Sequence, residues 1–215
     1  MKVLVACEFS GTVRDAFAAR GHDAWSCDIL PTEKSGQHIQ CDVLEILDDG
    51  WDLMIAFPPC THLAVSGAAW FEQKRIDGRQ QEGIEFFMKL VNADIPAIAI
   101  ENPVGVMSSV YRKPDQIIQP YFFGDQVTKK TCLWLKRLPR LYHSDSDTLF
   151  YSATHVGQGE FYEWTDGKTG KQKRMSMFHA QAKGFGGKAP EGVEHGKARS
   201  VTFQGIANAM AEQWG

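Results

Sequence analysis

Two short segments of this chain carry side chains that could react together. Residues 57–60, Phe-Pro-Pro-Cys, close an apolar run, and Glu101 directly follows a second apolar run at 98–100. If both runs are strands of a parallel sheet, Cys60 and Glu101 reach the carboxyl edge, where such sheets bind ligands. A thiolate is a nucleophile, and a carboxyl group can donate a proton. The pair therefore predicts addition of the thiol to an electron-poor ring whose nitrogen the carboxyl group protonates.

The elements that must position this pair alternate between strands and helices. Strands are predicted at 3–6, 23–27, 53–57 and 97–100, and helices at 12–20 and 80–92, with a polar loop leading to 41–43. This alternation predicts an α/β fold, Rossmann-like, with a mostly parallel sheet and right-handed crossovers. Further strands are predicted at 116–123 and 131–135, and a closing helix at 203–214.

Length and composition restrict the class of protein. A chain of 215 residues, 43% hydrophobic and 23% charged, is typical of one globular domain with a small appendage. No apolar stretch approaches the roughly 20 residues that span a bilayer, and the first residues do not resemble a signal peptide. The five cysteines lack paired spacing, which argues against a disulfide framework and a CxxC metal site. We therefore expect a cytoplasmic protein that binds neither membrane nor metal.

Positive charge is concentrated in the second half of the chain. Residues 125–200 contain 13 Lys and Arg against 8 Asp and Glu, although the whole chain has a net charge of −3. Nucleic-acid binders often concentrate charge in this way, because phosphate contacts supply much of their affinity. A solvated lysine-rich surface would give the same composition. Residues 143–199 show no strong periodicity, which predicts a loop-rich insert or a small subdomain.

The turn after the first strand is a candidate cofactor site. Residues 7–12, Cys-Glu-Phe-Ser-Gly-Thr, join the first strand to the first helix, and Gly11 allows the backbone to approach a ligand. The chain has no GxGxxG and no GxxxxGK motif, so neither a dinucleotide nor a nucleoside triphosphate is favoured. Asp28 could bind ribose hydroxyls, and Asp42 could reach an adenine amino group. A glycine turn of this kind also occurs for structural reasons alone.

Together, these segments resemble a known enzyme family. The glycine turn, Asp28, Asp42, Pro-Pro-Cys and Glu-Asn-Pro, in this order, resemble the S-adenosylmethionine-dependent cytosine-C5 DNA methyltransferases, especially the compact versions of bacteriophages and prophages. The resemblance covers residues 1–137 and resumes at 199–215. It implies a catalytic and cofactor-binding core at 1–137, a reduced target-recognition insert at 138–199, and a C-terminal helix at 200–215. It also implies DNA methylation in a bacterial host cell, as in restriction-modification systems.

The resemblance assigns roles to individual residues of this chain. Cys60 matches the catalytic cysteine, and Glu101 matches the acid at ring nitrogen 3. The implied residues for S-adenosylmethionine are Phe9, Ser10, Gly11, Thr12, Asp28, Ile29, Asp42, Val43 and Pro59. The implied substrate-binding residues are Pro58, Ser66, Asn102, Lys129 and Thr131, and no metal is implied.

The implied reaction explains why a thiol and a carboxyl group are both needed. Carbon 5 of cytosine is a poor nucleophile until Cys60 adds to carbon 6 and Glu101 protonates nitrogen 3. Carbon 5 can then attack the methyl carbon of S-adenosylmethionine, and loss of its hydrogen expels Cys60. The target atom is inaccessible inside a duplex, so the base must be flipped out. Methyltransferases that act on exocyclic amino groups carry an aromatic residue after Pro-Pro, so Cys60 argues against them.

Two departures from the family pattern leave the substrate open. Where larger members carry Gln-x-Arg-x-Arg, this chain has residues 126–131, so the arginines become Lys129 and Thr131. Lysine keeps the charge but lacks the planar fork of arginine. The short insert would read few bases or depend on an accessory protein. RNA or a free nucleotide therefore remains an alternative substrate, and so does a catalytically silent protein that binds DNA or S-adenosylmethionine.

Overall fold

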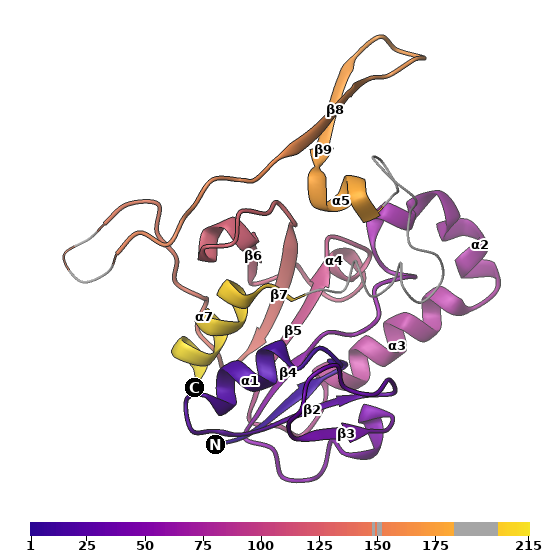
Figure 1. Ribbon diagram of the computed structural model, residues 1–215. Helices are drawn as coiled ribbons and strands as arrows, with labels where there is room; N and C mark the ends of the chain where they lie inside the picture. The colour runs from indigo at the N-terminus through magenta and orange to yellow at the C-terminus, as the bar shows by residue number, and fades with distance from the viewer. Residues whose placement is uncertain (148, 150–151, 183–201) are drawn as a thin grey trace. The chain divides into compact units, whose positions relative to one another are not determined.

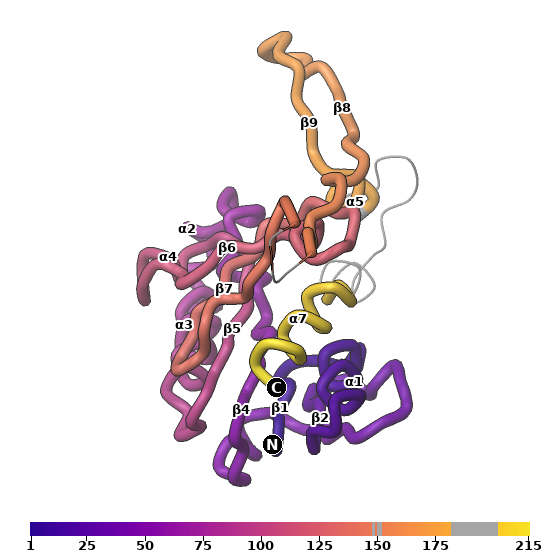
Figure 2. The backbone as a smooth tube through the Cα atoms, turned by 90° about the vertical axis from the view of Figure 1, so that its left-hand side faces the viewer, coloured from indigo at the N-terminus to yellow at the C-terminus, as the bar shows by residue number. Residues whose placement is uncertain are grey.

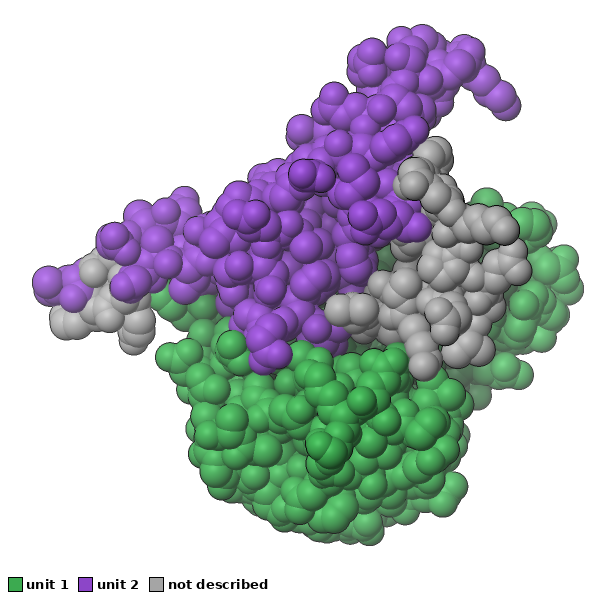
Figure 3. Space-filling model, viewed as in Figure 1, with its two compact units in different colours: residues 1–118, 130–142, 207–215 green, residues 119–129, 143–206 purple. Residues whose placement is uncertain are grey.

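The structure, a computed structural model, has two compact units, which Figure 3 shows in different colours. It describes residues 1–147, 149, 152–182 and 202–215. Unit 1 comprises residues 1–118, 130–142 and 207–215, and unit 2 comprises residues 119–129 and 143–206. Parts of the predicted insert, at 148, 150–151 and 183–199, lie outside the described residues. The division into a core, an insert and a closing helix stays a prediction.

Unit 1 is built on a seven-stranded sheet with the order β3-β2-β1-β4-β5-β7-β6. Its strands are β1 (Lys2–Ala6), β2 (Asp23–Asp28), β3 (His38–Gln40), β4 (Leu53–Ala56), β5 (Ala97–Pro103), β6 (Gln116–Ile118) and β7 (Thr131–Lys136). The first five strands in this order pair in parallel, whereas β7 is antiparallel to both of its neighbours. The central strands are continuous apolar runs because both sheet faces are covered. The predicted α/β fold with a mostly parallel sheet is confirmed.

Helices cover both faces of this sheet. The helix α1 (Thr12–Ala18) connects β1 to β2, and α3 (Arg79–Val91) connects β4 to β5. These crossovers run in opposite directions across the sheet, so right-handed connections require the two helices to lie on opposite faces. Figures 1 and 2 show this arrangement, with residues 207–214 of α7 (Gln204–Trp214) on the face of α1. The connection from β3 to β4 runs over the same face as α3 and contains a short 3-10 turn, η1 (Val43–Glu45).

Shorter elements complete the two units. Unit 1 also contains η2 (Val65–Trp70), α2 (Phe71–Ile76) and α4 (Met107–Val110). Unit 2 contains η3 (Pro120–Phe123), β8 (Phe161–Thr165), β9 (Gln172–Ser176) and α5 (Met177–Ala182). None of the helices in the described part of the chain is both long and apolar enough to cross a membrane.

The structure corrects three predictions of local structure. Residues 116–123 do not form one strand, since β6 ends at Ile118 and the 3-10 turn η3 begins at Pro120. Proline has no N–H to donate to a neighbouring strand, so the ladder stops there. The region predicted as loop-rich contains the ribbon β8–β9 and the helix α5. The polar loop before Cys41 contains β3, an edge strand whose side chains give no apolar signal.

Unit 2 has an aromatic cluster that includes two histidines. The ring of Phe122 stacks on His143 at 4.4 Å and on His155 at 4.7 Å between ring centres. Nδ1 of His143 lies 2.8 Å from Nε2 of His155, within hydrogen-bonding distance. Burial, followed by the neighbouring His155, lowers the pKa of His143, which favours its neutral ring. These histidines therefore contribute to packing within unit 2.

Candidate active site

The two reactive segments leave the same edge of the sheet. The strands β4 and β5 pair in parallel, with Ala56 opposite Ile100. Residues 57–60 continue from Ala56, and Glu101 directly follows Ile100, so both segments lie at the carboxyl ends of neighbouring strands. The predicted position of both segments at the carboxyl edge of the sheet is confirmed, and their strands are neighbours. The side chains of Cys60 and Glu101 are both partly exposed, as a pair that meets a substrate must be.

Asn102 ties the Cys60 loop to the strand that carries Glu101. Its Nδ2 donates to the backbone carbonyl of Pro58 at 2.9 Å, and its side chain is 1% exposed. The Oδ1 atom of Asn102 is buried and bonds to no described residue, so it keeps its acceptor capacity. The backbone amides of Leu63 and Ala64 both donate to the carbonyl of Cys60, at 3.0 and 2.9 Å. Residues 58–64 therefore form a turn that is hydrogen-bonded at both ends.

A backbone bridge joins the segments that follow Cys60 and Glu101. The amide of Val65 donates to the carbonyl of Val104 at 3.0 Å, and that of Val106 donates to Leu63 at 2.9 Å. Gly105 lies between these two bonds. A Cβ atom on Gly105 would lie 2.2 Å from the carbonyl oxygen of Leu63, so only glycine permits this approach. The two segments are therefore fixed to each other close to the reactive side chains.

A third strand contacts the carboxyl group of Glu101. The strand β7 pairs antiparallel with β5, which places Thr131 opposite Pro103. Oγ1 of Thr131 donates to Oε1 of Glu101 and lies 3.5 Å from the carbonyl oxygen of Asn102. The resemblance places an arginine of the larger family members at this position. In this chain a buried, neutral hydroxyl group contacts the acid instead.

The segment after Cys60 is anchored by two side chains that the sequence analysis missed. Lys74 is 8% exposed, and its Nζ donates to the carbonyl of Thr61 at 2.6 Å. Nε2 of Gln80 donates to the carbonyl of His62 at 3.2 Å. A lysine in a charged segment normally lies in solvent, so no sequence signal indicated this role. The predicted substrate residue Ser66 lies in η2, in the same segment, and is exposed.

The predicted cofactor residues lie where β1, β2 and β3 end. Cys7 directly follows β1, Asp28 ends β2, and Asp42 comes two residues after β3. Cys7 has a φ of 58°, a left-handed conformation that residues other than glycine adopt at a cost, often at functional turns. Burial raises the pKa of the Cys7 thiol, and the charge of Asp28 raises it further. The thiol of Cys7 is therefore protonated and is no second nucleophile.

Each acid at this edge accepts a backbone hydrogen bond within its own turn. Oδ1 of Asp28 accepts from Leu30 at 2.9 Å, and Oδ1 of Asp42 accepts from Leu44 at 3.0 Å. Burial raises the pKa of Asp28, whereas the bond from Leu30 opposes this effect. The neighbouring predicted residues differ, because Ile29 is 72% exposed and Val43 is in the core. Phe9, Ser10 and Thr12 are half-buried, Pro58 is buried and Pro59 is exposed.

Glu8, which the sequence analysis did not single out, occupies the amino end of α1. Its carboxylate accepts hydrogen bonds from the amides of Val13 at 2.7 Å and Arg14 at 3.3 Å, and from Oγ of Ser10 at 3.2 Å. Burial raises the pKa of Glu8, and these hydrogen bonds oppose the rise. The oxygens of Glu8 thus occupy the amide donors at the positive end of α1, where an anionic ligand would otherwise bind. The turn therefore does not offer these amides to a phosphate.

Gly11 is required by a buried arginine, which the sequence analysis also missed. Arg14 is 1% exposed and donates to Oγ of Ser26 at 3.2 Å and to the carbonyl of Ser35 at 3.0 Å. It also pairs with Asp15 at 2.7 Å. Gly11 has a φ of 69°, and a Cβ atom there would lie 2.4 Å from the guanidinium group. The glycine in this turn thus has a structural reason, independent of any ligand.

Lys129, which was predicted to bind substrate, belongs to unit 2. Its ammonium group lies 5.6 Å from the ring centre of Phe178 and 5.7 Å from that of Phe203, within cation–π range. Nearby in unit 2, the backbone amide of Gly205 donates to the carboxylate of Asp125 at 2.8 Å. The predicted residues that the structure brings together in unit 1 are Cys60, Glu101, Asn102, Pro58 and Thr131.

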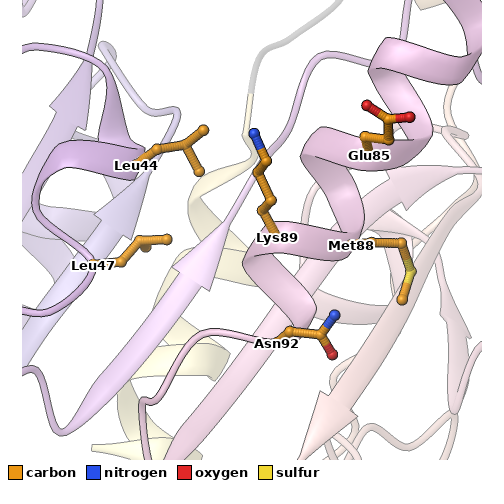
Figure 4. Close-up of a pocket in the computed structure, with 6 residues that line it drawn as sticks. All are labelled: Leu44, Leu47, Glu85, Met88, Lys89 and Asn92. Atoms are coloured by element: carbon orange, nitrogen blue, oxygen red, sulfur yellow. The ribbon is translucent and has the colours of Figure 1, made fainter.

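A separate hollow of about 750 Å³ lies between η1 and α3 (Figure 4). It is lined by Leu44, Leu47, Glu85, Met88, Lys89 and Asn92. Because α3 starts at the carboxyl edge and leads back to the start of β5, its last turns lie towards the opposite edge. None of the lining residues was predicted for the site, and none of them carries a thiol or a hydroxyl group. The hollow is therefore not the candidate active site.

Neither a metal cluster nor a known relative identifies the function. Among the residues that the structure describes, no group of three or more His, Cys, Asp or Glu could hold a metal ion. No protein-family model matches the chain, and a search of curated proteins finds no match to it. The function must therefore be inferred from the side chains and their geometry.

Proposed function

We propose that this chain transfers a methyl group from S-adenosylmethionine to carbon 5 of cytosine in DNA. Cys60 is the nucleophile, and Glu101 is the acid at ring nitrogen 3. The observation that supports the proposal is the parallel pairing of β4 with β5, because residues 57–60 and Glu101 continue from the carboxyl ends of these neighbouring strands. The hydrogen bond from Asn102 to Pro58 and the Gly105 bridge hold the two segments in place before any substrate binds.

The proposed reaction uses each side chain for one bond change. The thiolate of Cys60 adds to carbon 6 of a flipped cytosine, while Glu101 gives a proton to nitrogen 3. The electron pair of the former carbon 5–carbon 6 double bond moves to the carbon 4–carbon 5 bond, which makes carbon 5 nucleophilic. Bound S-adenosylmethionine would supply an electrophilic methyl group to carbon 5 and leave as S-adenosylhomocysteine. After a base removes the proton from carbon 5, the carbon–sulfur bond breaks, the thiolate of Cys60 leaves, and Glu101 recovers its proton.

Thr131 suits an acid that must donate a proton. An arginine beside a carboxyl group favours the ionised form strongly, because opposite charges attract. A neutral hydroxyl donor gives less of this stabilisation while still fixing the orientation of one carboxyl oxygen. The replacement of an arginine by Thr131 therefore remains compatible with the role proposed for Glu101.

The carboxyl ends of β1, β2 and β3, where the predicted cofactor residues lie, fit S-adenosylmethionine better than a nucleotide phosphate. The carboxylate of Glu8 already takes the amides at the amino end of α1, where a phosphate would bind. S-adenosylmethionine has no phosphate, and its ribose hydroxyls need an acceptor such as Asp28 at the end of β2. Asp42 lies further along the edge, where it could accept a bond from the adenine amino group. The acids also favour the positive sulfonium.

The proposal is tested by covalent trapping. DNA that contains 5-fluorocytosine is incubated with S-adenosylmethionine and the chain, and the product is analysed by intact mass spectrometry. Fluorine cannot leave as a proton does, so the adduct on Cys60 accumulates. Cys60→Ala should lose the adduct, whereas Cys41→Ala, a matched change at another half-buried cysteine, should keep it. An adduct with RNA or a nucleotide alone would contradict DNA as substrate, and none at all would indicate a binding protein.

A further inference from the structure

The strands β8 and β9 form an antiparallel ribbon whose two faces differ. The register places Glu163 opposite Arg174 and Trp164 opposite Lys173. Because side chains alternate along a strand, one face carries the exposed residues Glu163, Thr165, Gln172 and Arg174, with the half-buried Phe161 and the buried Ser176 at its base. The other face carries Tyr162, Trp164, Lys173 and Met175, and its two aromatic rings stack at 6.0 Å. We call the first of these the polar face of the ribbon.

The tip of the ribbon is held by Asp166. The backbone amide of Asp166 donates to the carbonyl of Lys171 at 2.9 Å. Its carboxylate accepts from the amides of Lys168 at 3.1 Å and Thr169 at 2.9 Å, and it pairs with Lys173. The bond from Lys173, followed by that from the Thr169 hydroxyl, lowers the pKa of Asp166. These contacts keep the tip in one conformation, which reduces the entropy that binding would cost.

Positive charge gathers at the tip and along β9. Residues 168–174 contain four cations and no acid. Lys168 and Lys171 are exposed and form no ion pair with the described residues. The guanidinium of Arg174 lies 4.8 Å from the ring centre of Phe161, a contact that orients it while it stays exposed. Figures 1 and 3 show the ribbon extending beyond α5, the helix that follows it in unit 2.

We propose that the polar face of the ribbon enters the major groove of duplex DNA and reads base edges there. The groove is about 12 Å wide and accepts a two-stranded ribbon. Arginine, glutamine and glutamate are the side chains that pair with guanine, adenine and cytosine edges, and the polar face presents one of each. Lys168 and Lys171 contact the phosphates beside the groove. The major groove of A-form RNA is too deep and narrow for such a ribbon, so the surface fits DNA.

This inference rests on the proposed function only in taking DNA as the substrate, and binding is measured separately from catalysis. The full-length chain first selects its preferred duplexes from a randomised DNA library. Affinity for a selected duplex is then measured by fluorescence anisotropy across a range of salt concentrations. Lys168→Gln with Lys171→Gln should reduce the slope of log Kd against log salt by about 2, since each phosphate contact contributes about 0.9. The control pair, Lys89→Gln with Lys113→Gln, removes two exposed lysines of unit 1 and should leave the slope unchanged.

A separate substitution, at Arg174, tests whether the ribbon distinguishes base sequences. Arg174→Ala should reduce the preference for the selected duplex over a scrambled one by about 5- to 150-fold, the range for one bidentate base contact. An unchanged preference in Arg174→Ala, an unchanged salt slope in the lysine variant, or equal affinity for duplex RNA would each overturn the inference. The 5-fluorocytosine adduct is followed in the same samples. Ribbon-dependent binding without an adduct would remove the proposed function alone, whereas an adduct with ribbon-independent binding would remove this inference alone.

Discussion

The substitution Gly105→Ala tests whether the backbone bridge positions the reactive pair. The added Cβ would lie 2.2 Å from the carbonyl oxygen of Leu63 and 2.9 Å from its carbonyl carbon, so the backbone must move. That movement breaks or stretches the two bridge bonds, Val65 to Val104 and Val106 to Leu63. Each backbone bond contributes about 0.5–1.5 kcal/mol, so the free energy of unfolding should fall by about 1–3 kcal/mol. For a chain of this size, the melting temperature should then fall by about 2–12 °C.

The same substitution should slow the chemistry more than it weakens cofactor binding. Leu63 donates its amide to the carbonyl of Cys60, so a shift of Leu63 displaces the thiol relative to Glu101. A displacement of about 1 Å can reduce a rate about 100-fold. The rate of adduct formation with 5-fluorocytosine DNA is measured by quenched time points, and S-adenosylmethionine affinity by calorimetry. Gly157→Ala is the control, because a Cβ there meets nothing within 4 Å. If Gly105→Ala reacts at the wild-type rate, the bridge does not position the pair.

Three further substitutions test individual contacts. Because burial raises the pKa of Glu8, the native state holds a proton there above the ordinary value of 4.5, and the stability due to that proton is lost as pH rises through the folded-state pKa. As the pH rises above the ordinary value of 4.5, urea melts should therefore show wild type losing stability relative to Glu8→Gln, whereas a constant difference would contradict the raised pKa of Glu8. Asp28→Asn should weaken S-adenosylmethionine binding about tenfold by calorimetry, and unchanged affinity would place the ribose elsewhere. Thr131→Val should slow adduct formation about two- to tenfold at unchanged cofactor affinity, and Thr131→Ser should restore the rate. A wild-type rate in Thr131→Val would mean that the bond to Glu101 is dispensable.

The sheet and the reactive edge could be predicted because their signals are local. The central strands β1, β4 and β5 each contain a short apolar run, which is the pattern of a buried parallel strand. Once β4 and β5 are neighbours, the chain order alone brings Cys60 and Glu101 to one edge. The tip of the ribbon also had a local signal in Gly170, whose φ of 66° is a conformation that favours glycine in a turn.

The buried charges could not be predicted, because their partners are distant in the sequence. Arg14 bonds to Ser26 and Ser35, and nothing within α1 distinguishes it from an exposed arginine. The sequence alone predicts Lys74 at the surface, because its bond to the turn after Cys60 forms only in the folded chain. The sequence likewise gives no sign that Gly105 lies against Leu63. In each case the decisive fact is a tertiary contact rather than a residue type.

Three of the contacts that hold the active site together use no reactive side chain. The ties are the side chain of Asn102, the backbone around Gly105 and the ammonium group of Lys74. These three ties use no atom of the Cys60 side chain, so Cys60→Ala should leave them in place. Asn102→Ala removes the donor to Pro58 and keeps both reactive groups. Loss of the adduct in Cys60→Ala would therefore report on chemistry, whereas a slower adduct with a lower melting temperature in Asn102→Ala would report on positioning.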